Sequence, residues 1–143
     1  MQMTPYLRCL SKDVILPASY TATQTSSVSM DTKGWTWLRV KAHLGAWATD
    51  ETVTFTLQDS ADDSSFAAVS GGPTTGAFGA SATAGDQPKE ILVHIPSAGF
   101  RRYIKVTATH TGTGSFIYGV ECELVGPENT AMATQTPTVK VVN

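Results

Sequence analysis

The stretch Trp35-Thr-Trp-Leu-Arg-Val-Lys-Ala-His-Leu44 is followed after a short turn by Glu51-Thr-Val-Thr-Phe-Thr-Leu-Gln-Asp-Ser60. Apolar and polar side chains alternate in both segments, and this period of two is typical of half-buried strands. The predicted core positions are Leu38, Val40, Ala42, Leu44, Val53, Phe55 and Leu57. Because Gly45-Ala-Trp-Ala-Thr-Asp50 supplies a turn, the two segments are predicted to form an antiparallel hairpin with one core face and one polar face.

The same alternation returns later in the chain, in Glu90–Ile95, Arg102–Thr109 and Phe116–Val125. The last two are separated by Thr111-Gly-Thr-Gly-Ser115, so they are predicted to form a second hairpin. About seven or eight strands at roughly ten-residue spacing, with no helical pattern, indicate an all-β fold. We expect an antiparallel β-sandwich or a jelly-roll-like barrel with extended terminal arms.

Composition limits the classes of protein and partner. A chain of 143 residues is long enough for one domain with a real core. Its formal net charge of -2, without a basic stripe, argues against nucleic acid as a partner. No apolar run approaches the ~20 residues of a membrane span, and no signal peptide is recognisable, so we expect no membrane partner and a reducing cytoplasm.

The chain is expected to divide into an N-terminal arm (1–18), a β-sandwich domain (19–127) with a Gly-rich loop (70–88), and a C-terminal tail (128–143). The arm forms either an edge strand or a free segment, and both termini are predicted to bind a partner by adding a strand or lying in a groove. A fragment of residues 17–127 is therefore expected to fold nearly as stably as the whole chain. The apolar residues predicted to make these contacts are Val14, Ile15, Leu16, Val139, Val141 and Val142.

Two groups of larger side chains are further candidates for partner binding. Trp35 and Trp37 stand beside the cations Arg39 and Lys41 on the predicted polar face, where aromatic residues serve as interface anchors; alternatively, one tryptophan packs beneath the N-terminal segment. The second group lies at the start of a later strand. Its cations either contact a partner's carboxylates or form a solvated edge. It consists of Arg101, Arg102 and Tyr103.

No motif predicts catalysis, a metal or a cofactor. Asp59, Asp62 and Asp63 lack the spacing of a calcium loop and are interpreted as a solvated turn. Gly112-Thr-Gly114 lies between two strands, without the helix that a phosphate loop needs. His43, His94 and His110 carry no sequence signature of a nucleophilic site, so we expect a protein that is not an enzyme.

The two cysteines leave two interpretations open. Cys122 is in phase with Phe116, Tyr118 and Val120, as a small buried hydrophobic residue would be. The alternative is a disulfide between Cys9 and Cys122. In the first case a reductant leaves the melting temperature unchanged, whereas in the second it lowers it.

Several segments taken together resemble the small capsid-decoration (cement) and related head proteins of tailed bacteriophages. They are Val28-Ser-Met-Asp-Thr-Lys-Gly-Trp35, Phe55-Thr-Leu-Gln-Asp-Ser-Ala-Asp-Asp-Ser-Ser-Phe66, Phe100-Arg-Arg-Tyr-Ile-Lys-Val106 and a closing strand that ends at Gly126-Pro127. Such proteins often have a Gln-x-Ser-x-Asp turn after a strand and an Arg-Tyr pair that opens a later strand. The resemblance spans residues 28 to 127.

The resemblance implies a β-sandwich or jelly-roll body that binds the outside of the viral shell, often as a homotrimer, and locks capsomers together. The implied partners are the major capsid protein and copies of the chain itself, and the implied location is the capsid surface of a virion assembled in the host cytoplasm. One alternative is a phage head-tail connector or tail component. The other is a carbohydrate-binding or adhesin module, in which Trp35, Trp37 and Trp47 form a stacking platform.

Overall fold

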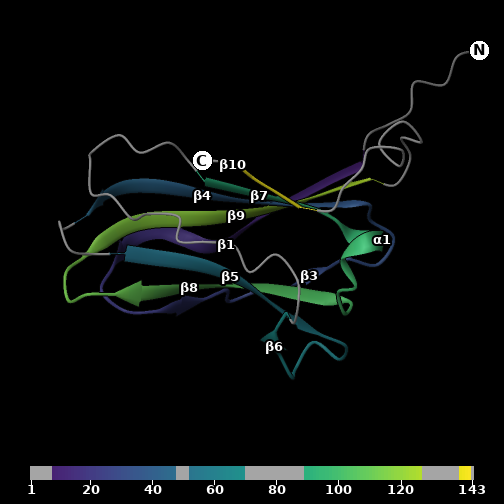
Figure 1. Ribbon diagram of the computed structural model, residues 1–143, viewed down its shortest axis with the longest axis horizontal. Coiled ribbons are helices and arrows are strands. Elements are labelled where there is room, and N and C mark those ends of the chain that lie inside the picture. The colour runs from purple at the N-terminus through teal and green to yellow at the C-terminus, as the bar shows by residue number, and fades with distance from the viewer. Residues whose placement is uncertain (1–7, 48–51, 70–88, 127–138, 143) are drawn as a thin grey trace, which may run out of the picture.

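The computed structural model describes residues 8–47, 52–69, 89–126 and 139–142, which form two antiparallel β-sheets packed face to face (Figure 1). The prediction of an all-β sandwich is therefore confirmed. Sheet A has the strand order β1 (Arg8–Tyr20), β9 (Phe116–Gly126), β4 (Trp37–Trp47), β7 (Lys89–His94) and β10 (Val139–Val142). Sheet B has the order β2 (Gln24–Thr25), β8 (Tyr103–Thr111), β5 (Thr52–Ser60) and β6 (Ala67–Ala68), and β3 (Met30–Asp31) also pairs with β8.

Both predicted hairpins are wrong, because their strands lie in different sheets. Strand β4 pairs with β9 and β7 in sheet A, whereas β5 pairs with β8 and β6 in sheet B. The connection from β4 to β5 and the connection from β8 to β9 therefore both cross from one sheet to the other. Strand β4 pairs with β9 in sheet A, and β5 pairs with β8 in sheet B. The pair β4–β5 and the pair β8–β9 therefore lie next to each other in both sheets, as such pairs do in a jelly roll.

The predicted alternation is confirmed, and it fills the space between the two sheets. The long strands β4, β5, β8 and β9 turn about every second side chain inward, so apolar residues of both sheets share one core. The ring of Tyr118 in sheet A meets that of Phe55 in sheet B edge to face, with their centroids 5.5 Å apart. The largest fully buried side chains also include Phe116, Met30, Leu38, Leu57, Ile91, Ile104 and Leu124.

The structure corrects the expected N-terminal boundary, because Arg8–Tyr20 is the edge strand of sheet A rather than a free arm. Its register with β9 shifts between Asp13 and Ile15 and again between Ile15 and Ala18. Gly119 allows this irregular strand to approach closely, since a Cβ atom there would lie 2.8 Å from Cγ of Pro17. The residues up to position 18 that the structure describes thus belong to the sandwich.

The remaining expected segments are only partly described. The Gly-rich loop 70–88 and residues 127–138 of the tail lie outside the described residues. The end of the tail is strand β10, in which Val139 pairs with Val93 and Val142 with Glu90 of β7. A short helix, α1 (Ile95–Ala98), ends β7. Within the described ranges, no helix is long and apolar enough to cross a membrane.

Candidate interaction surface

A row of paired charges ties together four strands on the outer face of sheet A. Arg39 of β4 donates through one terminal nitrogen to Oε2 of Glu90 on β7 at 3.0 Å, and through the other to Oε2 of Glu123 on β9 at 3.4 Å. The thiol of Cys9 on β1 donates to Oε1 of Glu123 at 2.9 Å. These contacts hold the arginine between two carboxylates, and the bond to Glu90 is the main reason that the pKa of Arg39 is raised.

A second row runs beside the first and centres on Glu121 of β9. The hydroxyl of Ser11 on β1 donates to its carboxylate, and Nε2 of His43 on β4 lies 3.8 Å from its Oε2. Lys41 stands opposite Glu121 in the β4 to β9 register. The hydrogen bond from Ser11 is the largest cause that lowers the pKa of Glu121, and the charges of Lys41 and His43 act in the same direction.

Arg39 and Lys41 thus lie on the outer face, as predicted, but within a mixed-charge network. The side chain of Arg39 is 36% exposed, and the two glutamates that it pairs with are 24% and 25% exposed. Such partly exposed pairs add little to folding stability. They do keep charged groups in fixed positions, which favours electrostatic recognition of a complementary surface.

Trp37 is not an exposed anchor, which corrects the prediction for this residue. Only 4% of it is exposed, and its ring lies 4.9 Å from that of His94. Its indole Nε1 is buried without a hydrogen-bond partner in the described structure. Trp35 is half-buried against the core, and the side chain of Trp47 is outside the described part. Trp37 therefore offers no free ring face for a sugar.

The two predicted basic contacts are occupied within the chain. Arg101 donates its Nε to Oδ1 of Asp59 at 2.7 Å, and Arg102 forms a two-bond pair with the carboxylate of Asp31 at 2.9 and 2.7 Å. The guanidinium of Arg102 also lies 4.9 Å from the ring centre of Tyr103. These arginines join the start of β8 to the ends of β5 and β3, which is a structural role that neither sequence interpretation included.

The apolar residues predicted to bind a partner divide into two groups. Val14 and Ile15 are only 2% and 4% exposed and belong to the core, which corrects their assignment as partner contacts. Leu16 projects outward and is 66% exposed. Val139, Val141 and Val142 lie in β10, whose backbone pairs with β7 of the same chain. The strand addition predicted for the tail thus occurs within this chain.

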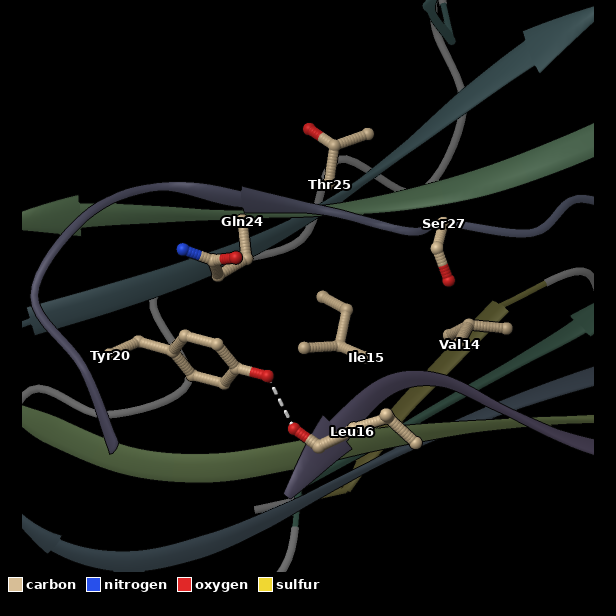
Figure 2. Close-up of a pocket in the computed structure, with 7 residues that line it drawn as sticks. All are labelled: Val14, Ile15, Leu16, Tyr20, Gln24, Thr25 and Ser27. Carbon is tan, nitrogen blue, oxygen red and sulfur yellow. Dashed lines mark hydrogen bonds between the residues drawn. The ribbon is translucent and has the colours of Figure 1, made fainter. Parts of the chain in front are cut away.

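Two adjoining clefts lie beside β1, on the open side of the sandwich. The first has a volume of about 190 Å³ and lies between the irregular part of β1 and β2; Figure 2 shows Ile15, Tyr20 and Gln24 around it. The hydroxyl of Tyr20 donates to the carbonyl oxygen of Leu16 at 2.5 Å and fixes one end. The second cleft, of about 400 Å³, is lined by Lys12, Ser27, Val28, Ser29, Asp63 and Lys105.

Ser27 lines both clefts, so the two clefts adjoin, and together we call them the β1 groove. Sequence reasoning did not find its basic half, because Lys12 and Lys105 are brought together only by the packing of sheet A on sheet B. The sequence signal for the apolar half was the Val14-Ile-Leu16 patch.

The described residues contain no group of three or more His, Cys, Asp and Glu side chains that could hold a metal ion. Asp62 organises the acidic turn, since its Oδ1 accepts hydrogen bonds from the backbone N–H groups of Ser64 and Ser65 at 3.0 and 2.9 Å. Both cysteines are free. Cys9 lies on the outer face whereas Cys122 is in the core, so the disulfide alternative is not realised in this structure.

Most of the chain matches the model of a known protein family. Residues 10–120 match the model of the family described as Bbp16. The chain belongs to the Bbp16 family. The matched region runs from β1 into β9 and includes the whole β1 groove, as well as Arg39 and Glu90, whereas Glu121 and Glu123 lie just beyond its end.

Two further comparisons accompany this Bbp16-family assignment. A chain in the structure of the infectious bursal disease virus Gt strain is similar to the protein, with a TM-score of 0.36 and 14% sequence identity. The alignment covers 100% of the Bbp16-family chain and 47% of the viral chain, so the former spans about half the length of the latter. No curated protein matches the sequence.

Proposed function

We propose that this Bbp16-family protein is a non-enzymatic structural protein of a tailed-bacteriophage virion. In this proposal it binds the outer surface of the capsid and stabilises contacts between capsomers, as a decoration or cement protein. Its partners are the major capsid protein and further copies of the chain, with a homotrimer as the expected assembly. The resemblance of residues 28–127 to phage decoration proteins supports this proposal, and most of those residues lie within the family match.

The structural observation that carries the proposal is the outer face of sheet A. Strands β4, β7 and β9 present charged side chains that are already paired, from Arg39 to Glu90 and Glu123, and the hydroxyl of Ser11 on β1 bonds to Glu121. A binding surface whose side chains are fixed before association loses less conformational entropy when it meets its partner. A charged surface also gives attachment that weakens as the salt concentration rises.

The test is a capsid-stability assay. Capsids without the protein are mixed with the purified chain, and the temperature at which they release their DNA is measured. We expect this temperature to rise with added protein until the sites are saturated, and to rise less at high salt. An unchanged release temperature, together with no binding in a sedimentation assay, would contradict the proposal.

A charge-reversal pair locates the contact. Arg39→Glu introduces a third carboxylate beside Glu90 and Glu123 on the outer face, so we expect it to weaken binding to the capsid. Lys33→Glu is the matched control, because Lys33 is an exposed turn residue away from this face. Circular dichroism of both variants verifies that they are folded. If the two variants bind the capsid equally well, the contact lies elsewhere on the molecule.

A further inference from the structure

Strand β1 leaves part of its backbone available on one side. It pairs with β9 along its length and is the terminal strand of sheet A. On its other side, a backbone hydrogen bond joins the N–H of Ser27 to the carbonyl oxygen of Val14 at 3.3 Å. Residues 9–13 are exposed, and no described strand pairs with them on that side. Such an edge can accept an additional strand through main-chain hydrogen bonds.

The β1 groove lies next to this edge and provides side-chain specificity. Its first cleft is lined by Val14 and Ile15 and has room for one apolar side chain. Leu16, beside that cleft, and Val28, in the second cleft, are exposed at 66% and 40%. Covering these apolar side chains with another chain would remove their surface from water, which stabilises association.

The second cleft has an excess of positive charge. It is lined by the cations Lys12 and Lys105 and by one carboxylate, that of Asp63. No ion pair joins either lysine to a carboxylate within the described residues. The ammonium group of Lys105 lies 4.6 Å from the ring centre of Phe66, which holds it in place by a cation–π contact. A further carboxylate would therefore complement this cleft, although the chain as a whole carries a net charge of -2.

We propose that the β1 groove binds an extended segment of another polypeptide that carries an apolar residue and an aspartate or glutamate. The segment adds a strand beside residues 9–13, places its apolar side chain in the first cleft and its carboxylate between Lys12 and Lys105. Since Lys12 and Val14 line adjoining clefts, the two recognised residues lie close together in the segment. This inference goes beyond the proposed function, since it concerns the isolated protein and requires no capsid.

The test selects short random peptides for binding to the full-length protein. Peptides that carry both an apolar and an acidic residue should be enriched. The best peptide is then titrated into isotope-labelled protein, and the backbone amides of residues 9–13 that point away from β9 should become protected from hydrogen exchange. The variant Lys12→Gln/Lys105→Gln should bind this peptide at least about tenfold more weakly, which equals ~1.4 kcal/mol.

Two controls make the result decisive. Lys33→Gln removes a cation outside the groove and should bind the peptide as the wild type does, while Lys12→Glu/Lys105→Glu should select peptides with lysine or arginine instead. The proposal is overturned if the wild-type selection shows no acidic and apolar preference. It is equally overturned if the selected peptide binds the Lys12→Gln/Lys105→Gln variant unchanged.

Discussion

The carboxylate of Asp59 binds both the backbone N–H and the guanidinium group of Arg101. One carboxylate oxygen of Asp59 accepts the backbone N–H of Arg101 at 2.9 Å, and the other accepts Nε of Arg101 at 2.7 Å. Asp59 is 6% exposed, so its charge depends on this single arginine for compensation. A residue that the sequence assigns to partner recognition therefore holds the end of β5 against the start of β8.

Arg101→Ala is predicted to destabilise the protein. The substitution leaves the buried Asp59 carboxylate without its charged donor, at a cost of about 2 kcal/mol. Arg102→Ala is the matched control, because its partner Asp31 is 44% exposed and such pairs contribute less than about 1 kcal/mol. Urea denaturation of the two variants measures the difference. Equal losses of stability would mean that burial of Asp59 is not what makes the first pair important.

Asp31 is predicted to titrate far below an ordinary aspartate. Its hydrogen bonds with Arg102 are the main cause that lowers its pKa from 3.8 to about 2. Since the folded pKa is depressed, the contribution of Asp31 to stability is present above pH 3.8 and is lost as the pH falls toward 2. Carboxyl chemical shifts in an NMR titration give the pKa directly. In the Arg102→Ala variant the pKa of Asp31 should return toward 3.8. A pKa of Asp31 already near 3.8 in the wild-type protein would show that the pair with Arg102 does not form in solution.

The two cysteines are predicted to differ in reactivity. Cys122 is 1% exposed and burial raises its pKa to about 12, so it should react with a thiol reagent only after unfolding. Cys9 is exposed and should react in the native protein, but slowly, because its hydrogen bond to Glu123 is the main cause that raises its pKa. Glu123→Gln should therefore speed the reaction of Cys9 with a disulfide reagent at mildly alkaline pH.

A reductant should leave the melting temperature unchanged, and a fall of several degrees would instead reveal a disulfide.

Removal of residues 1–16 is predicted to unfold the protein or to destabilise it severely. The deletion takes Val14 and Ile15 out of the core, and truncating even one such side chain to alanine costs about 1 to 5 kcal/mol. The whole domain has only about 5–15 kcal/mol of stability to lose. Leu16→Ala is the control, since this residue is exposed and should change the melting temperature little. If the fragment that begins at residue 17 has the same melting temperature as the full-length protein, the removed part of β1 is dispensable for the sandwich.

The period of two in the sequence predicts which side of each strand faces the core, but it does not predict which strands pair. Val40 and Phe55 are buried as expected, yet their strands lie in opposite sheets. The side-chain pattern of a strand is the same in a hairpin and in a connection that crosses between sheets, because both bury alternate residues. The strand partners depend on the whole topology, which a local pattern does not contain.

The candidate surface shows a similar limit. Sequence alternation correctly places Arg39 and Lys41 on the outer face, but it cannot tell that Trp37 on that face is buried. Likewise, the pairing of Arg101 with Asp59 and the approach of Lys12 to Lys105 join residues far apart in the chain. Such contacts arise from the packing of the two sheets, so no spacing within the sequence reveals them.

Whether the protein decorates the outer surface of a phage capsid is tested most directly by a cryo-electron microscopy reconstruction of the virion. We expect density of the β-sandwich outside the shell, repeated over the capsid lattice where capsomers meet, and lost when the gene is deleted. Density confined to the portal or tail, or a virion that lacks the protein altogether, would contradict the proposed function.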